Sequence, residues 1–165
     1  MSYPQSPEYQ FEQAIVPLFS SIAGLNVYTT NRTGSRLFPY VTISARQVRQ
    51  MVTPYSGVYE VEATISYSNT SAKYTATQFD EQYLDIFAGL YEVGQELNSK
   101  IQENAIDLLV YMARISEQTP TILANKRAWV RGIKLSAIIT PDENIDSSRA
   151  YIFSEELNSF YLATI

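Results

Sequence analysis

The sequence predicts an α+β fold: a mostly antiparallel sheet with a long β-hairpin, and helices packed on one face. Two observations predict this class. Some segments alternate apolar and polar residues with period two, as half-buried strands do, and others repeat apolar residues every three or four positions, as amphipathic helices do. The chain has 165 residues, of which 45% are hydrophobic and 18% charged. This length fits one domain that buries roughly two thirds of its unfolded surface.

The long hairpin is the clearest predicted element. Its strands are expected over residues 40–52 and 55–68, because apolar side chains occupy alternate positions in both segments. Pro54 and Gly57 supply turn geometry between them. The first strand is expected to contain an irregularity between Ala45 and Met51, which both belong to its apolar side. Residues 26–29 are expected to form a short strand, and residues 31–39 a loop.

Two amphipathic helices are predicted. The first begins at Ser6, which can cap the helix, followed by Pro7 at the first helical position. Its apolar face continues to residue 22, but Pro17 interrupts it and Gly24 favours a stop. The second covers residues 77–98, with Thr75 or Thr77 as its cap, because apolar residues keep helical spacing over that stretch.

The later elements are strands with one ambiguous segment. Residues 101–115 fit a helix at their start and a strand at their end, and we favour a strand from about residue 108 to 115. Thr119 and Pro120 end it. Residues 128–140 alternate and predict another strand, which Pro141 stops. We expect a domain over residues 1–140, followed by an extension or terminal hairpin over residues 141–165.

The extension carries apolar side chains after a polar break, so we expect it to bind a partner, for example by adding a strand to a sheet edge. The residues expected to do so are Tyr151, Phe153, Phe160 and Tyr161.

Composition argues against several functions. The chain has no cysteine and no histidine, so Ser-His-Asp and Cys-His catalysis and His- or Cys-based zinc sites are excluded. We therefore expect no enzyme activity, no metal and no cofactor. The N-terminal residues lack a basic segment followed by an apolar one, and no apolar run is long enough to span a bilayer. These patterns predict a soluble protein made in a cytoplasm.

Charge is segregated along the chain. Residues 13–59 and 118–141 contain no acid, whereas residues 80–107 contain seven acids and one base. The segregation is explained either by separately solvated faces or by a basic face meeting an acidic face of a neighbouring subunit. For the second case, the expected interface residues are Arg32, Arg36, Arg46, Arg49, Glu60 and Glu62.

Two other uses of these charges fit the sequence less well. Arginines near aromatic residues suit nucleic acid, but a formal net charge of −5 argues against a dedicated binder. Glu60 and Glu62 lie two residues apart, as a carboxylate pair in an active site could, yet exposed glutamates opposite arginines of a hairpin are commoner.

The order of elements resembles the tail terminator, or tail-completion, proteins of long-tailed bacteriophages. The resemblance covers residues 6–140 and depends on the sequence of elements rather than on a catalytic motif. It comprises an N-terminal amphipathic helix leading to Val27-Tyr28, an arginine-containing loop ending in Phe38-Pro39, the strand over residues 59–67, a long helix and a late strand containing Trp129.

This resemblance implies a structural virion protein that forms a ring, hexameric in the family, caps the tail tube and stops its polymerisation. It also implies contacts with the tail tube protein and with a head-neck connector protein, and DNA that passes through the lumen without specific binding. The resemblance also implies that the protein is located in the tail or neck of the virion, which is assembled in the host cytoplasm. Three alternatives remain: another head-tail connector, a nucleic-acid or ligand-binding module, and an enzyme that uses carboxylates alone.

Overall fold

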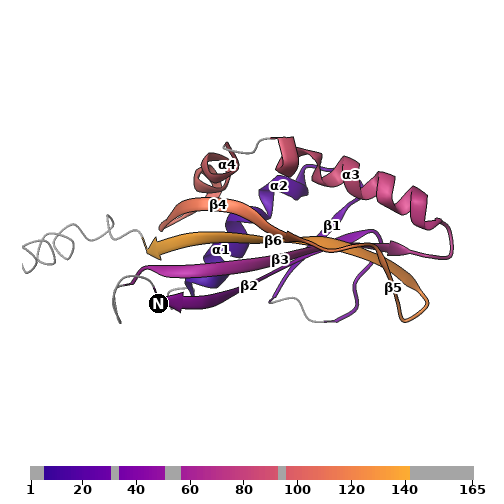
Figure 1. The fold of residues 1–165 in the computed structure, drawn as a ribbon, viewed down its shortest axis with the longest axis horizontal. Coiled ribbons are helices and arrows are strands. Elements are labelled where there is room, and N and C mark those ends of the chain that lie inside the picture. The colour runs from indigo at the N-terminus through magenta and orange to yellow at the C-terminus, as the bar shows by residue number, and fades with distance from the viewer. Residues whose placement is uncertain (1–5, 31–33, 51–56, 93–95, 142–165) are drawn as a thin grey trace, which may run out of the picture.

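The computed structural model describes residues 6–30, 34–50, 57–92 and 96–141. Strands form a single sheet, and helices cover one of its faces (Figure 1). The helices are α1 (Pro7–Ile15), α2 (Pro17–Ser20), α3 (Ala76–Glu92) and α4 (Leu97–Asn104). The strands are β1 (Asn26–Thr29), β2 (Tyr40–Gln50), β3 (Tyr59–Thr70), β4 (Leu108–Gln118), β5 (Ile122–Ala124) and β6 (Ala128–Pro141).

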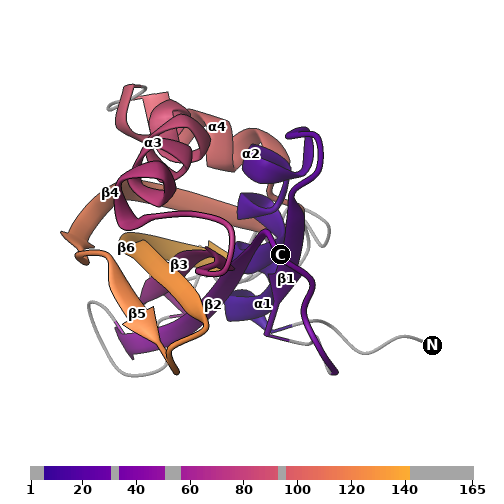
Figure 2. The same ribbon diagram turned by 90° about the vertical axis from the view of Figure 1, so that its right-hand side faces the viewer.

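The strand order confirms the predicted α+β class. The order is β1-β2-β3-β6-β4, and β5 pairs with the first residues of β6. Among the strands of the described residues, β1 and β2 run parallel and the other pairs are antiparallel. Seen from the end of the long axis, α3, α4 and α2 lie together on one side of the strands (Figure 2).

The predicted long hairpin is confirmed as β2 and β3. Their register runs from Tyr40 opposite Ser68 to Gln50 opposite Tyr59. A bulge shifts the register between Gln47 and Arg49, which confirms the expected irregularity. The second strand starts at Tyr59 rather than at residue 55, and the turn residues 51–56 lie outside the described part.

The core fills the space between the helices and one face of the sheet. Alternate residues of β3 and β6 point into it, because side chains on a strand alternate between faces. Phe79, Tyr83 and Phe87 of α3 are fully buried. The other fully buried side chains include Phe11, Ala14, Ile15, Val41, Ile43, Val61, Ala63, Ile65, Ile101, Leu135 and Ile139.

The N-terminal helix begins where the sequence predicts, but the helical run ends at Ser20, before the predicted residue 22. The Ser6 hydroxyl accepts a hydrogen bond from the Tyr9 amide at 3.2 Å. Because Pro17 has no amide hydrogen and crowds the preceding turn, the helical run divides into α1 and α2. Gly24, with a φ of 77°, lies in the turn that leads to β1.

The predicted helix over residues 77–98 is wrong at its C-terminal end. α3 ends at Glu92, and Leu97 begins the separate helix α4. The pattern misled because buried Leu97 and Ile101 continue the three-and-four spacing of α3 in a different helix. The ambiguous segment contains both elements: α4 reaches Asn104, and the favoured strand is confirmed as β4 from Leu108. The short strand β5 was not predicted.

Candidate subunit interface

Two arginine–glutamate pairs lie across β2 and β3 on the sheet face that no described helix covers. Arg46 Nη2 is 3.0 Å from Glu62 Oε1, and Arg49 Nε is 2.7 Å from Glu60 Oε1. The strand register places the members of each pair directly opposite one another, on either side of the bulge. The structure therefore brings four of the six predicted interface residues together, as pairs within one subunit.

The arginines are the accessible members of these pairs. The Arg46 and Arg49 side chains are 68% and 67% exposed, against 19% and 25% for Glu62 and Glu60. Exposed pairs of this kind add only about 0.2–1 kcal/mol to stability. A guanidinium group carries five N–H donors, so each arginine keeps donors for a neighbouring molecule.

The loop before β2 places Arg36 at the other end of that strand. The Leu37 amide donates to the Tyr28 hydroxyl at 3.2 Å, and the Asn26 side chain donates to the Leu37 carbonyl at 3.0 Å. These bonds hold the loop against β1 and leave Leu37 and Phe38 66% and 43% exposed. Arg36 is also exposed, whereas Arg32 lies outside the described residues.

A buried carboxylate ties α1 to the start of this loop and to β2. Glu12 is 2% exposed and accepts hydrogen bonds from the Thr30 amide at 3.0 Å, the Thr30 hydroxyl and the Ala45 amide at 2.8 Å. Sequence reasoning missed this role, because an acid inside an amphipathic helix usually faces water. The only available signal was its position next to Phe11, on the apolar side of the helix.

At a second bulge, the Met112 side chain projects into solvent from the uncovered sheet face. Met112 has a φ of 57°, and the register shifts between Tyr111 and Arg114. The Ala113 amide donates to the Asn98 side chain of α4 at 2.9 Å, which fixes the bulge. Met112 is 63% exposed and borders a hollow of about 200 Å³ beside Arg49 and Arg114. No sequence signal distinguished this bulge from a regular strand.

Polar side chains also gather between α3 and β6. Arg131 Nη1 is 3.3 Å from Asp80 Oδ1, the Thr121 hydroxyl donates to the same carboxylate, and the guanidinium lies 4.4 Å from the Tyr83 ring centre. Burial, reinforced by the hydrogen bond to Tyr91, raises the pKa of Tyr83 well above its usual range. Tyr83 therefore stays neutral at neutral pH. The cluster fastens α3 to the sheet.

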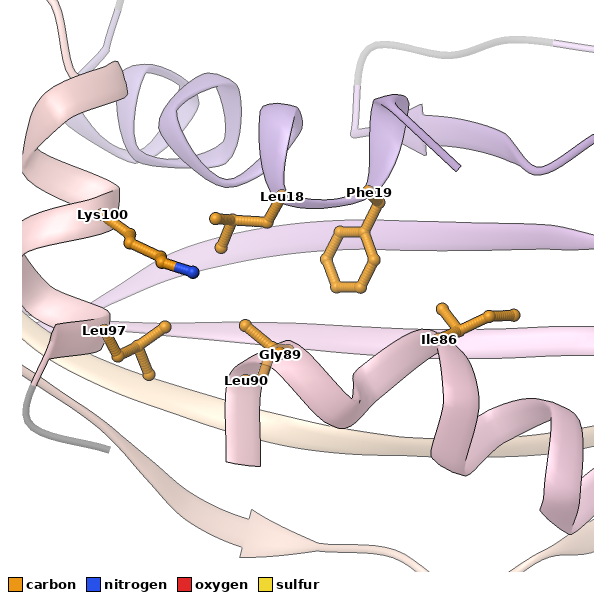
Figure 3. Close-up of a pocket in the computed structure, with 7 residues that line it drawn as sticks. All are labelled: Leu18, Phe19, Ile86, Gly89, Leu90, Leu97 and Lys100. Atoms are coloured by element: carbon orange, nitrogen blue, oxygen red, sulfur yellow. The ribbon is translucent and has the colours of Figure 1, made fainter. Parts of the chain in front are cut away.

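An apolar pocket opens between α2, α3 and α4 (Figure 3). Its volume is about 70 Å³, below the ~300 Å³ at which ligand pockets begin. Lys100 is the one charged group among the described lining residues, and Gly89 forms part of the wall. The pocket admits the end of a single side chain.

The expected partner-binding residues Tyr151, Phe153, Phe160 and Tyr161 lie outside the described residues. Within the described ranges, no group of three His, Cys, Asp or Glu side chains is placed to hold a metal ion. No helix in the same ranges is long and apolar enough to cross a membrane. No protein-family model matches the chain, and no curated protein matches it.

Proposed function

We propose that this chain is a structural subunit that assembles with copies of itself into a ring. The observation that carries the proposal is the uneven cover of the sheet: helices pack on one face, and the other carries exposed Arg46, Arg49, Tyr111 and Met112. Arginine, aromatic and methionine side chains are enriched in protein interfaces, so this uncovered face suits one.

The more specific proposal is a ring that acts as a tail terminator of a long-tailed phage, capping the tail tube and joining it to the neck. Its support is the order of elements that the sequence shares with that family. A long hairpin, helices on one sheet face and an exposed loop before β2 suit a subunit that contacts neighbours on several sides. Another head-tail connector is the nearest alternative.

Light scattering during size-exclusion chromatography tests the assembly. The chain has a mass of 18.7 kDa, so a ring gives a particle at an integral multiple of that mass, stable on dilution. A particle with the mass of one chain at all concentrations, up to tens of micromolar, would contradict the proposal.

A further inference from the structure

The turn between β5 and β6 forms a basic and apolar tip, here called the β5–β6 tip and defined by Ile122, Leu123, Lys126 and Arg127. Ile122 and Leu123 are 56% and 46% exposed. Both cations are exposed at the end of the hairpin. Residues 118–141 contain no acid, so the sequence around the tip supplies no local counter-charge.

The tip has a defined conformation. Asn125 and Lys126 both have positive φ values, 53° and 58°, and the Arg127 amide donates to the Ala124 carbonyl at 3.1 Å. The Arg127 carbonyl accepts from the Ser71 amide at 3.0 Å, which fastens the tip to the segment between β3 and α3. A surface held in this way loses little conformational entropy when it binds a partner.

The opposite end of the molecule carries a cleft whose described lining is mostly polar and includes the acid Asp107 and the aliphatic Ile106. This cleft, called the α1–α4 cleft, has a volume of about 440 Å³ and lies between α1 and the turn from α4 to β4. Ile106 is 75% exposed at its edge, and Asp107 is exposed beside it. Glu103 is exposed one turn earlier on α4. The lining residues are Tyr9, Gln10, Gln13, Pro17, Asn104, Ile106 and Asp107.

Figure 1 shows β5 and α4 at opposite ends of the long axis. The two ends match in chemistry, because exposed Ile122 and Leu123 lie beside bases at one end and exposed Ile106 lies beside acids at the other. Lys126 and Arg127 of one copy therefore suit Glu103 and Asp107 of another, with Ile122 and Leu123 against Ile106.

We propose that the β5–β6 tip of one copy docks in the α1–α4 cleft of the next. The inference rests on the proposed self-assembly and names the two surfaces that make one of its contacts. Because these surfaces differ, the contact is heterologous: repeated around an axis it closes a ring, and without closure it gives a filament. Complementary charges at such a contact set the register and exclude wrong partners.

Two variants with opposite charge changes test the pairing. One carries Lys126→Glu and Arg127→Glu and has acids at both ends. The other carries Glu103→Lys and Asp107→Asn and has bases at both ends; asparagine is chosen because residue 107 has a φ of 59°, which asparagine tolerates. We expect each variant alone to assemble with a dissociation constant about tenfold weaker or more.

Mixing the two variants should restore assembly, because the acidic tip of one meets the basic cleft of the other and the reverse contact keeps the original charges. A matched control, Glu81→Lys with Asp85→Lys, changes the charge of the exposed face of α3 and should assemble like the original chain. Light scattering reports the masses, and thermal melts show that each variant is folded.

The outcomes separate this contact from self-assembly itself. If both variants assemble like the original chain, the tip-to-cleft contact is wrong and the ring proposal stands. Variants that dissociate and are not restored by mixing show that these charges meet something other than each other, which also overturns the contact. An original chain that stays monomeric overturns both proposals.

Discussion

Gly132 of β6 lies so close to β3 that a Cβ atom on it would stand 2.3 Å from the carbonyl oxygen of Ile65. That separation is shorter than any normal contact, and both the oxygen and the nearby Ser66 Cα belong to backbone that cannot rotate away. The two central strands therefore depend on glycine at this position.

Gly132→Ala should lower the free energy of unfolding by about 1–3 kcal/mol through overpacking. The matched control is Gly89→Ala on α3, where an added Cβ meets nothing within 4 Å. There, alanine should raise stability by about 0.8–1 kcal/mol, because glycine is a poor helix former. Urea melts of both variants measure the difference. Equal effects of the same sign would show that the packing around Gly132 has been described wrongly.

Truncation of Phe87 should be strongly destabilising. Its ring is fully buried. The centre of this ring lies 5.3 Å from the centre of the Phe19 ring and 4.3 Å from the centre of the Tyr83 ring. Phe87→Ala should cost about 3–5 kcal/mol in denaturant melts. Leu84→Ala on the same helix serves as the control. Because Leu84 is 51% exposed, this substitution should lower the free energy of unfolding much less. A loss below about 1 kcal/mol for Phe87 would place this face of α3 outside the core.

The sequence predicted the fold well where an apolar pattern came from one helix or strand. It predicted the fold less well where one apolar pattern ran across two elements. In β3 and β6 the alternation belongs to a single strand, and each strand covers the alternating residues, although β3 begins at Tyr59 rather than at residue 55. In residues 77–98 one spacing spans two helices, because Leu97 of α4 faces the same core as Leu90 of α3. Periodicity reports which side is buried, and it does not report where the backbone changes direction.

The candidate interface was predictable only where neighbouring strands fix the partners. Arg46 and Glu62 pair because hairpin register places them opposite each other, and that register follows from the turn and the apolar pattern. The role of Glu12 depends on backbone donors at Thr30 and Ala45. The direction of Met112 depends on a bulge fixed by Asn98. Contacts between distant segments leave no local sequence pattern.

Stability should fall at alkaline pH because of Tyr83. Burial raises the pKa of this hydroxyl above its ordinary value of 10.0, whereas the unfolded chain titrates near the ordinary value. The stabilising difference is thus fully present below about pH 10 and is lost as the pH rises further. Tyr83→Phe should reduce the fall in melting temperature between about pH 9 and 11. Equal curves for Tyr83→Phe and the original chain would contradict the assignment.

Reversing Arg46 and Arg49 to glutamate should weaken assembly in a salt-sensitive manner, since exposed charges are screened over ~10 Å at 0.1 M salt. The reversal also places like charges opposite Glu62 and Glu60. The effect of losing the ion pairs within the subunit must therefore be separated from the effect of losing contacts with a neighbouring subunit. Adding Glu62→Arg and Glu60→Arg restores the pairs with exchanged positions.

We expect this exchange to recover stability, measured by thermal melts, and to leave assembly weakened, because the arginines are the accessible members of each pair. Full recovery of the oligomeric mass by the exchanged variant would show that the arginines act only within their own subunit.

Negative-stain electron microscopy of the purified chain tests the central claim most directly, because class averages show the shape of the assembly as well as its existence. The proposed function predicts closed rings of one size with a central opening wide enough for a tail tube lumen. Fields that contain only single small particles, or compact assemblies without an opening, would contradict it.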